Sequence, residues 1–129
     1  MKSILKQKSE FNLDAGIKLI NEYLYAPSVH CLYYSCFQLM KVIIHEYDGI
    51  KYEDFEKKDA HEFVIHKIIT HLNGIDKKEY LEFNRIIKEL KKLRTEADYD
   101  ESEILIDKAE TARRHSNYIR NKLIKTFNQ

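Results

Sequence analysis

The stretch from Val29 to Tyr47 constrains the fold more than any other part of the chain. Its apolar residues recur three, four and seven positions apart, which places them on one face of a helix. They are Val29, Leu32, Tyr33, Cys36, Phe37, Met40, Ile43, Ile44 and Tyr47. Leu39 and Val42 widen this face. The pattern therefore predicts a central helix that packs against neighbours on several sides.

The composition agrees with an all-helical chain. One proline and three glycines among 129 residues are too few for a β-sandwich or barrel, which needs a turn every ten residues or so. Hydrophobic residues make up 43% of the chain, enough to build a core, and the length suits one domain. We predict a single all-α domain over residues 1–129, built as an antiparallel bundle of four to five helices.

The apolar spacing predicts four further helices, at Glu10–Tyr25, Ala60–Leu72, Asp76–Tyr99 and Glu103–Thr126. The predicted caps are Ser28, Asp59 and Asp76 at N-termini and Gly49 at a C-terminus. Glu79 stands at the capping-box position of the fourth helix. The acidic segment 50–58 is predicted to be a loop or a single turn.

Charge is unevenly distributed, although the formal net charge is +1. Segment 46–62 holds seven acids and three lysines, whereas segment 111–129 holds five basic residues and no acid. Arg113, Arg114 and Arg120 are therefore predicted to form a basic surface. The alternative is that solvated helix faces simply differ in sign.

No feature of the sequence predicts a membrane-spanning segment or a disulfide formed in an oxidising environment. No apolar run approaches the roughly 20 residues of a membrane span, and the polar stretch 1–8 does not resemble the core of a signal peptide. Cys31 and Cys36 are five residues apart and point in different directions on a helix, so we expect two reduced thiols. We expect a cytoplasmic protein without membrane contact.

The histidines do not predict a metal site. His61, His66 and His71 recur every five residues, so each is rotated by roughly 140° from the last about a helix axis. Ligand pairs on one helix need a spacing of three or four, which no two histidines have. Three isolated glycines cannot form a phosphate-binding loop. The sequence predicts neither a metal nor a cofactor.

Two clusters hold most of the residues capable of chemistry. Arg94 and Asp98 are four residues apart, so they can pair on one helix face. The run His30–Phe37 contains Tyr33 and Tyr34 in the predicted central helix. Taken separately, the first cluster is a salt bridge at a helix end and the second is aromatic core packing.

In this order and spacing, the two clusters resemble the HEPN family, small helical domains of prokaryotic toxin–antitoxin and defence systems. The resemblance covers about Ala15 to Leu123. Residues 33–37, Tyr-Tyr-Ser-Cys-Phe, are similar to the family's Tyr-Tyr-Ala-x-Phe signature. Residues 93–99 are similar to its Leu-Arg-x-x-Ala-Asp-Tyr run. His61 resembles a histidine that often opens the third helix.

The resemblance implies a homodimer whose nuclease branch cleaves RNA without metal through an Arg-x(4–6)-His motif. Here the positions allowed for that histidine after Arg94 hold Tyr99, Asp100 and Glu101. A tyrosine is a poor general base near neutral pH. The candidate catalytic residues are Arg94, Asp98 and Tyr99, and the predicted binding cleft adds Tyr33 and Tyr34.

Three functions follow as hypotheses. The first is a dimeric binding module for RNA, a nucleotide or a minimal nucleotidyltransferase, a common genomic partner in the family. The second is an active, metal-free endoribonuclease toxin with a rearranged site that uses His30, His61 or His115. The third is a purely structural subunit.

Overall fold

A computed structural model describes residues 3–56, 59–101 and 103–129, and no strand occurs in these ranges. The helices are α1 (Ile4–Asn21), α2 (Tyr25–Asp48), the short 3-10 helix η1 (Tyr52–Glu56), α3 (Ala60–Asn73), α4 (Lys77–Tyr99) and α5 (Ile106–Phe127). The predicted all-helical fold is confirmed. Throughout the described ranges, no helix is both long and apolar enough to cross a membrane.

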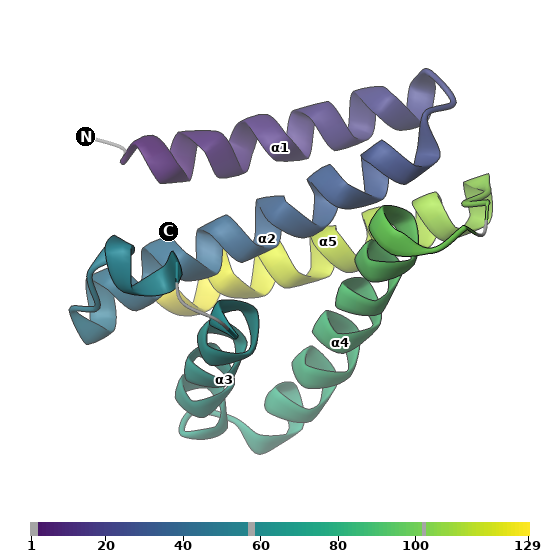
Figure 1. Ribbon diagram of the computed structural model, residues 1–129. Helices are drawn as coiled ribbons and strands as arrows, with labels where there is room; N and C mark the ends of the chain where they lie inside the picture. The colour runs from purple at the N-terminus through teal and green to yellow at the C-terminus, as the bar shows by residue number, and fades with distance from the viewer. Residues whose placement is uncertain (1–2, 57–58, 102) are drawn as a thin grey trace.

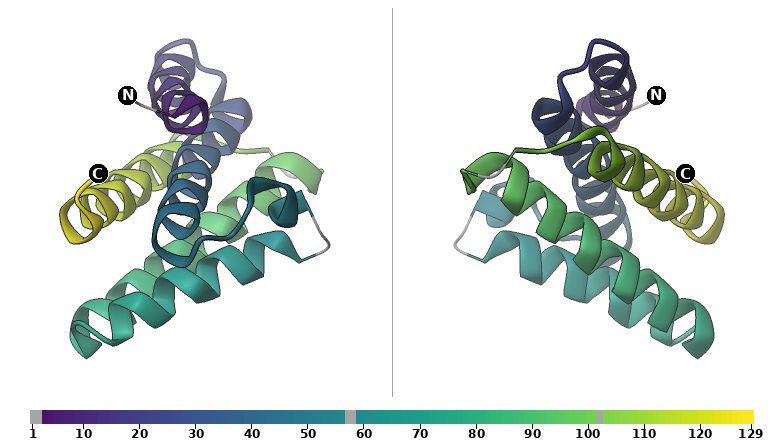
Figure 2. Two further views of the ribbon diagram at one scale, coloured as in Figure 1. Left: turned by 90° about the vertical axis from the view of Figure 1, so that its left-hand side faces the viewer. Right: turned by 90° about the vertical axis from the view of Figure 1, so that its right-hand side faces the viewer.

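Helix α2 occupies the centre of the molecule, as its apolar pattern predicts. It contacts α1, α3, α4 and α5. Helices α1 and α5 lie along it, while α3 and α4 form a hairpin that crosses it on another side (Figures 1 and 2). Every apolar position predicted for its inner face is buried except Tyr47, whose ring is half exposed and whose hydroxyl donates to the Phe127 carbonyl.

The bundle is antiparallel in part. Helix α1 is antiparallel to α2, and both α3 and α5 are antiparallel to α4. For α4 and α5, the ion pairs Glu79–Lys122 and Glu96–Lys108 establish the direction. Helices α2 and α5 run in the same direction, because the start of α2 meets the middle of α5 at Leu32 and Ser116 and their C-termini meet at Tyr47 and Phe127. The transverse α3–α4 hairpin allows this parallel pairing.

The first two helices begin earlier than predicted. The Ser3 side chain caps α1 by accepting from the Lys6 backbone N–H. Helix α2 starts at Tyr25, with Pro27 in its first turn, where the missing N–H is tolerated. The prediction that Ser28 caps α2 is wrong. Its buried hydroxyl instead donates to the carbonyl of Gly16 across the α1–α2 contact.

The other predicted caps hold to different degrees. Asp76 caps α4 through the backbone N–H groups of Lys78 and Glu79, whereas the Glu79 carboxylate binds Lys122 rather than completing a capping box. Asp59 and Gly49 both have positive φ at their helix ends, and the Asp59 side chain makes no cap bond. Segment 50–58, predicted as a loop or a single turn, contains η1, and its residues 57 and 58 lie outside the described ranges.

Small polar residues line the contact between α1, α2 and α5. Ser9 donates to the Ser35 carbonyl, and Ser116 donates to the Leu32 carbonyl. Arg120 was predicted on a basic surface, and that prediction is wrong. Arg120 is 7% exposed, and its Nη1 donates to the Ser9 hydroxyl and the Ser35 carbonyl. The guanidinium satisfies a carbonyl that a small-residue interface brings within reach.

The predicted basic surface is reduced to two arginines of unequal exposure. Arg114 is exposed and donates to the Thr111 hydroxyl, while Arg113 is half-buried. Both cysteines are free thiols, as predicted, and Cys36 is buried beside Ser116. Segment 111–129 therefore presents less positive charge to solvent than its sequence indicates.

Replacing Gly16 by alanine is expected to destabilise the fold by about 1–3 kcal/mol. A Cβ at this position would stand 2.7 Å from Leu32 Cγ, closer than van der Waals contact allows. Urea unfolding of both proteins measures the difference. The control is Gly74→Ala, where the nearest atom is 3.5 Å away and the free energy of unfolding should stay level or rise by up to about 1 kcal/mol. Equal effects at both glycines would contradict the tight α1–α2 contact.

Candidate functional site

Arg94 of α4 lies at the centre of the candidate site. It is 8% exposed. Its guanidinium carbon lies 5.1 Å from the ring centre of Tyr33 and 5.8 Å from the ring centres of both Tyr34 and Tyr99. Aromatic faces attract a cation, so these rings offset part of the cost of burying the charge. We call Arg94 with Tyr33, Tyr34, Asp98, Tyr99, His30 and His61 the Arg94 cluster.

Asp98 links Arg94 to the start of α2. Its Oδ2 is 3.6 Å from Arg94 Nη1, so the predicted pair forms at a long distance. The same carboxylate lies 2.9 Å from Nδ1 of His30, which makes His30 its closer partner. A carboxylate at Nδ1 keeps the imidazole proton there and leaves Nε2 free to accept one. The His30 side chain is 46% exposed, so this arrangement is open to solvent.

The Nε of Arg94 is buried and finds no hydrogen-bond partner in the part of the chain that the structure describes. Leaving a buried donor unsatisfied costs roughly 1–3 kcal/mol, more when the group is charged. Such a group calls for an explanation in any native structure. Arg94 also lines the hollow described below, so the rest of its guanidinium borders open space.

His61 of α3 completes one wall of the cluster. Its ring stacks on Phe37 at 4.1 Å, and its Nδ1 is 2.7 Å from the Tyr33 hydroxyl. Burial, reinforced by the nearby charges of Arg94, Lys91 and Lys41, lowers the pKa of His61 to about 4. Burial also raises the pKa of Tyr33 well above its usual range. At neutral pH both groups are therefore neutral. With the Tyr33 hydroxyl donating, His61 carries its proton on Nε2.

A hollow of about 430 Å³ opens beside these residues, and we call it the Arg94 pocket. It is lined by Phe55, Asp59, Ala60, His61, Glu62, Lys91 and Arg94. Lys91 lies three residues before Arg94 and so on the same side of α4. Its pairing with Glu62 is long, at 3.9 Å. The pocket thus combines two cationic side chains and a neutral imidazole with two carboxylates.

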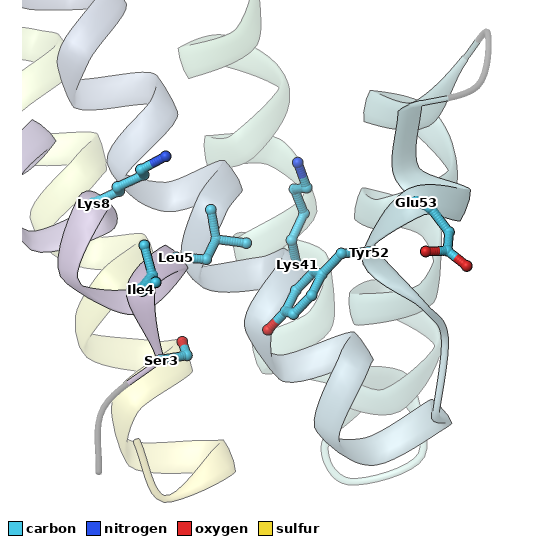
Figure 3. A pocket seen from close by; sticks show the side chains of 7 residues that line it. All are labelled: Ser3, Ile4, Leu5, Lys8, Lys41, Tyr52 and Glu53. Atoms are coloured by element: carbon cyan, nitrogen blue, oxygen red, sulfur yellow. The ribbon is translucent and has the colours of Figure 1, made fainter.

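A larger hollow of about 550 Å³ lies elsewhere, between the start of α1, Lys41 of α2 and η1 (Figure 3). Its walls are mainly the apolar parts of Ile4, Leu5 and Tyr52, and Lys8 and Lys41 stand at one end. Size alone does not make it the better site. Among the described side chains that line it, none has a buried polar atom without a hydrogen-bond partner, as Arg94 has.

The structure brings together all five residues of the predicted cleft, namely Tyr33, Tyr34, Arg94, Asp98 and Tyr99. It also places His30 and His61 beside them. His115 lies apart, where it pairs with Glu89 on the α4–α5 surface. The three evenly spaced histidines lie at different places: His61 is in the Arg94 cluster, His66 lines the hollow between α3 and α4, and His71 pairs with Asp48.

The histidines, cysteines and carboxylates of the described ranges contain no group of three that could hold a metal ion. Two residues of the site escaped the sequence analysis. Lys91 was detectable from its spacing of three from Arg94. Phe37 belonged to the His30–Phe37 run but was given no role in the site, because no local pattern indicates that His61 stacks on it from another helix.

We predict that His61 makes stability pH-dependent. Its pKa falls from 6.5 in the unfolded chain to about 4 in the fold, so the unfolded state binds more protons between these values. Stability is therefore full above pH 6.5 and is lost as the pH falls towards 4. His61→Phe, which keeps the stacking on Phe37, should flatten the dependence of unfolding free energy on pH. An imidazole titration midpoint at or above 6.5, measured by NMR, would contradict the burial of this ring.

Comparisons of the chain with protein-family models, with curated proteins and with solved structures find no match. The chemistry assigned to the Arg94 cluster therefore rests on the positions of its own side chains.

Proposed function

We propose that the protein is a HEPN-like helical module that binds a phosphate group of RNA or of a nucleotide at Arg94. The observation that carries the proposal is a buried guanidinium that lines an open pocket and whose Nε has no hydrogen-bond partner among the described residues. A guanidinium presents donors in a fixed plane and grips phosphate in a bidentate way. Because tyrosine rings hold it in place, little side-chain entropy is lost when it binds.

Two neighbours of Arg94 add to the attraction. Lys91 contributes a second positive charge to the pocket wall, and a neutral His61 can donate from Nε2. Glu62 and Asp59 oppose an anion, which favours a single phosphate held near Arg94 over a highly charged polyphosphate. This balance supports selective binding with moderate affinity.

The residue at the motif position supports binding without cleavage. Tyr99 stands where a nuclease of the resembled family has histidine, and it is 73% exposed with its ring over Arg94. A phenol there can stack or hydrogen-bond, but it does not supply a base at neutral pH. A homodimer and a minimal nucleotidyltransferase partner, both implied by the resemblance, belong to the same proposal.

One observation favours a second candidate function, a metal-free endoribonuclease. His30 has the geometry of a general base, because Asp98 holds Nδ1–H and leaves Nε2 exposed. In this reaction Nε2 takes the proton of a ribose 2′-hydroxyl, O2′ attacks phosphorus, and the bond to O5′ breaks. O5′ then takes a proton from water, and Arg94 stabilises the charge on phosphorus.

Replacing Arg94 by methionine is expected to weaken binding of a short single-stranded RNA by about tenfold to a hundredfold, the effect of losing a charged hydrogen bond. Methionine keeps an apolar stem against Tyr33, so the melting temperature should change little. Fluorescence anisotropy measures the affinity. The control is Arg114→Gln, which removes one exposed positive charge from α5. Equal losses in the two variants would refute a site at Arg94.

The second candidate function is tested separately, by incubating RNA with the protein in EDTA. Cleavage products ending in 2′,3′-cyclic phosphate are expected if His30 acts as a base, and His30→Gln should abolish them while RNA binding persists. His115→Gln serves as the matched control, because His115 lies outside the cluster. Intact RNA after prolonged incubation with the wild-type protein would leave the binding module as the function.

A further inference from the structure

We propose that the groove between α3 and α4 binds a single strand of RNA whose end lies in the Arg94 pocket. This inference rests on the proposed function and extends it from one phosphate to several nucleotides. Helices α3 and α4 form an antiparallel hairpin, and they diverge from the turn that joins them (Figures 1 and 2).

The groove is built from two adjoining hollows. The Arg94 pocket shares Glu62 and Lys91 with a second hollow of about 450 Å³. That second hollow is lined by Glu62, Ile65, His66, Ile69, Tyr80, Asn84, Lys88 and Lys91. The two hollows meet at Glu62 and Lys91, which line both and lie 3.9 Å apart as an ion pair. We call the two hollows together the α3–α4 groove.

One face of α4 supplies a row of groove residues with side chains suited to nucleic acid. The row is Arg94, Lys91, Lys88, Asn84 and Tyr80, with spacings of three, three, four and four. At 100° per residue, these spacings place the five residues within a sector of about 120° of the helix surface. From the first to the last, the helix rises by about 21 Å at 1.5 Å per residue. A stacked strand advances about 3.4 Å per nucleotide, so the row spans at most about six nucleotides.

Each part of the row matches a component of a nucleic-acid strand. The ammonium groups of Lys88 and Lys91 continue the positive charge of Arg94 and suit successive phosphates. Tyr80 is half-buried at the far end, where its ring offers a surface for base stacking. Asn84 and His66 can hydrogen-bond base edges from the two sides of the groove.

The shape of the groove favours a single strand over a duplex. The axes of packed helices lie about 8–10 Å apart, which leaves a groove between them too narrow to admit a double helix. Stacking on Tyr80 also requires a base that is free of its own stack. Glu62, whose side chain is 76% exposed, holds Lys91 at 3.9 Å. A phosphate can replace this long ion pair at little cost.

The test measures binding of single-stranded RNAs of two, four, six and ten nucleotides by fluorescence anisotropy. Affinity is expected to rise up to about six nucleotides and then to level off. Lys88→Gln should weaken binding of the six-nucleotide RNA about fivefold or more and leave the dinucleotide unaffected. The slope of log affinity against log salt should fall by about 0.7. Lys92→Gln is the matched control, since exposed Lys92 lines neither hollow.

Tyr80 tests the aromatic part of the groove. Tyr80→Leu keeps an apolar side chain against the core and should weaken the six-nucleotide RNA about fivefold or more, whereas Tyr80→Phe should bind like the wild type. Melting temperatures of both variants report whether the fold is intact. Equal binding by the leucine and phenylalanine variants would remove base stacking from the proposal.

The outcomes separate the groove from the phosphate site. Arg94→Met should weaken the dinucleotide and the six-nucleotide RNA alike, whereas Lys88→Gln should affect only the longer one. If Arg94→Met fails to weaken the dinucleotide, the proposed phosphate site is wrong. Three results would refute the groove while leaving the Arg94 site standing. They are an affinity independent of RNA length, equal affinities of Lys88→Gln and Lys92→Gln for the six-nucleotide RNA, and binding of duplex RNA as tight as that of the single strand.

Discussion

The structure depends on the burial of α2 from all sides. Its residues Val29, Leu32 and Ile43 are fully buried, and a helix that is apolar around most of its circumference is stable in water only when other helices cover it. Helices α1, α3, α4 and α5 cover it, and each packs against a part of its surface. Small residues let α1 approach closely at Gly16, while bulky rings such as Phe37 meet the α3–α4 hairpin. The Arg94 cluster forms where that hairpin meets the start of α2.

Burial also accounts for the chemistry of the site. A guanidinium among tyrosine rings is held in one orientation, and His61 is kept neutral by the same surroundings. The Asp98 carboxylate lies 3.6 Å from the Arg94 guanidinium and 2.9 Å from the His30 imidazole. The proposed phosphate binding and the proposed acid–base chemistry therefore involve neighbouring side chains of one cluster, and single substitutions distinguish them.

Local patterns predicted what depends on local geometry. The inner face of α2 and the Asp76 cap follow from spacing along one helix. The closeness of Tyr33 and Tyr34 to Arg94 was expected from the family resemblance, not from spacing. Arg120 was predicted at the surface because it is charged. Its position, four residues after Ser116 on the small-residue face of α5, indicates burial instead. The contact between His30 and Asp98 joins residues 68 apart, and no periodicity reports such a contact.

The parallel pairing of α2 with α5 sets an order on folding. Its contacts join residues 80 to 84 positions apart, such as Tyr47 with Phe127 and Leu32 with Ser116. The α1–α2 and α3–α4 hairpins can close early, because their partners are near in sequence and little loop entropy is lost. One flank of the central helix stays uncovered until α5 has left the ribosome. A nascent chain is thus exposed to misassembly until α5 has been made.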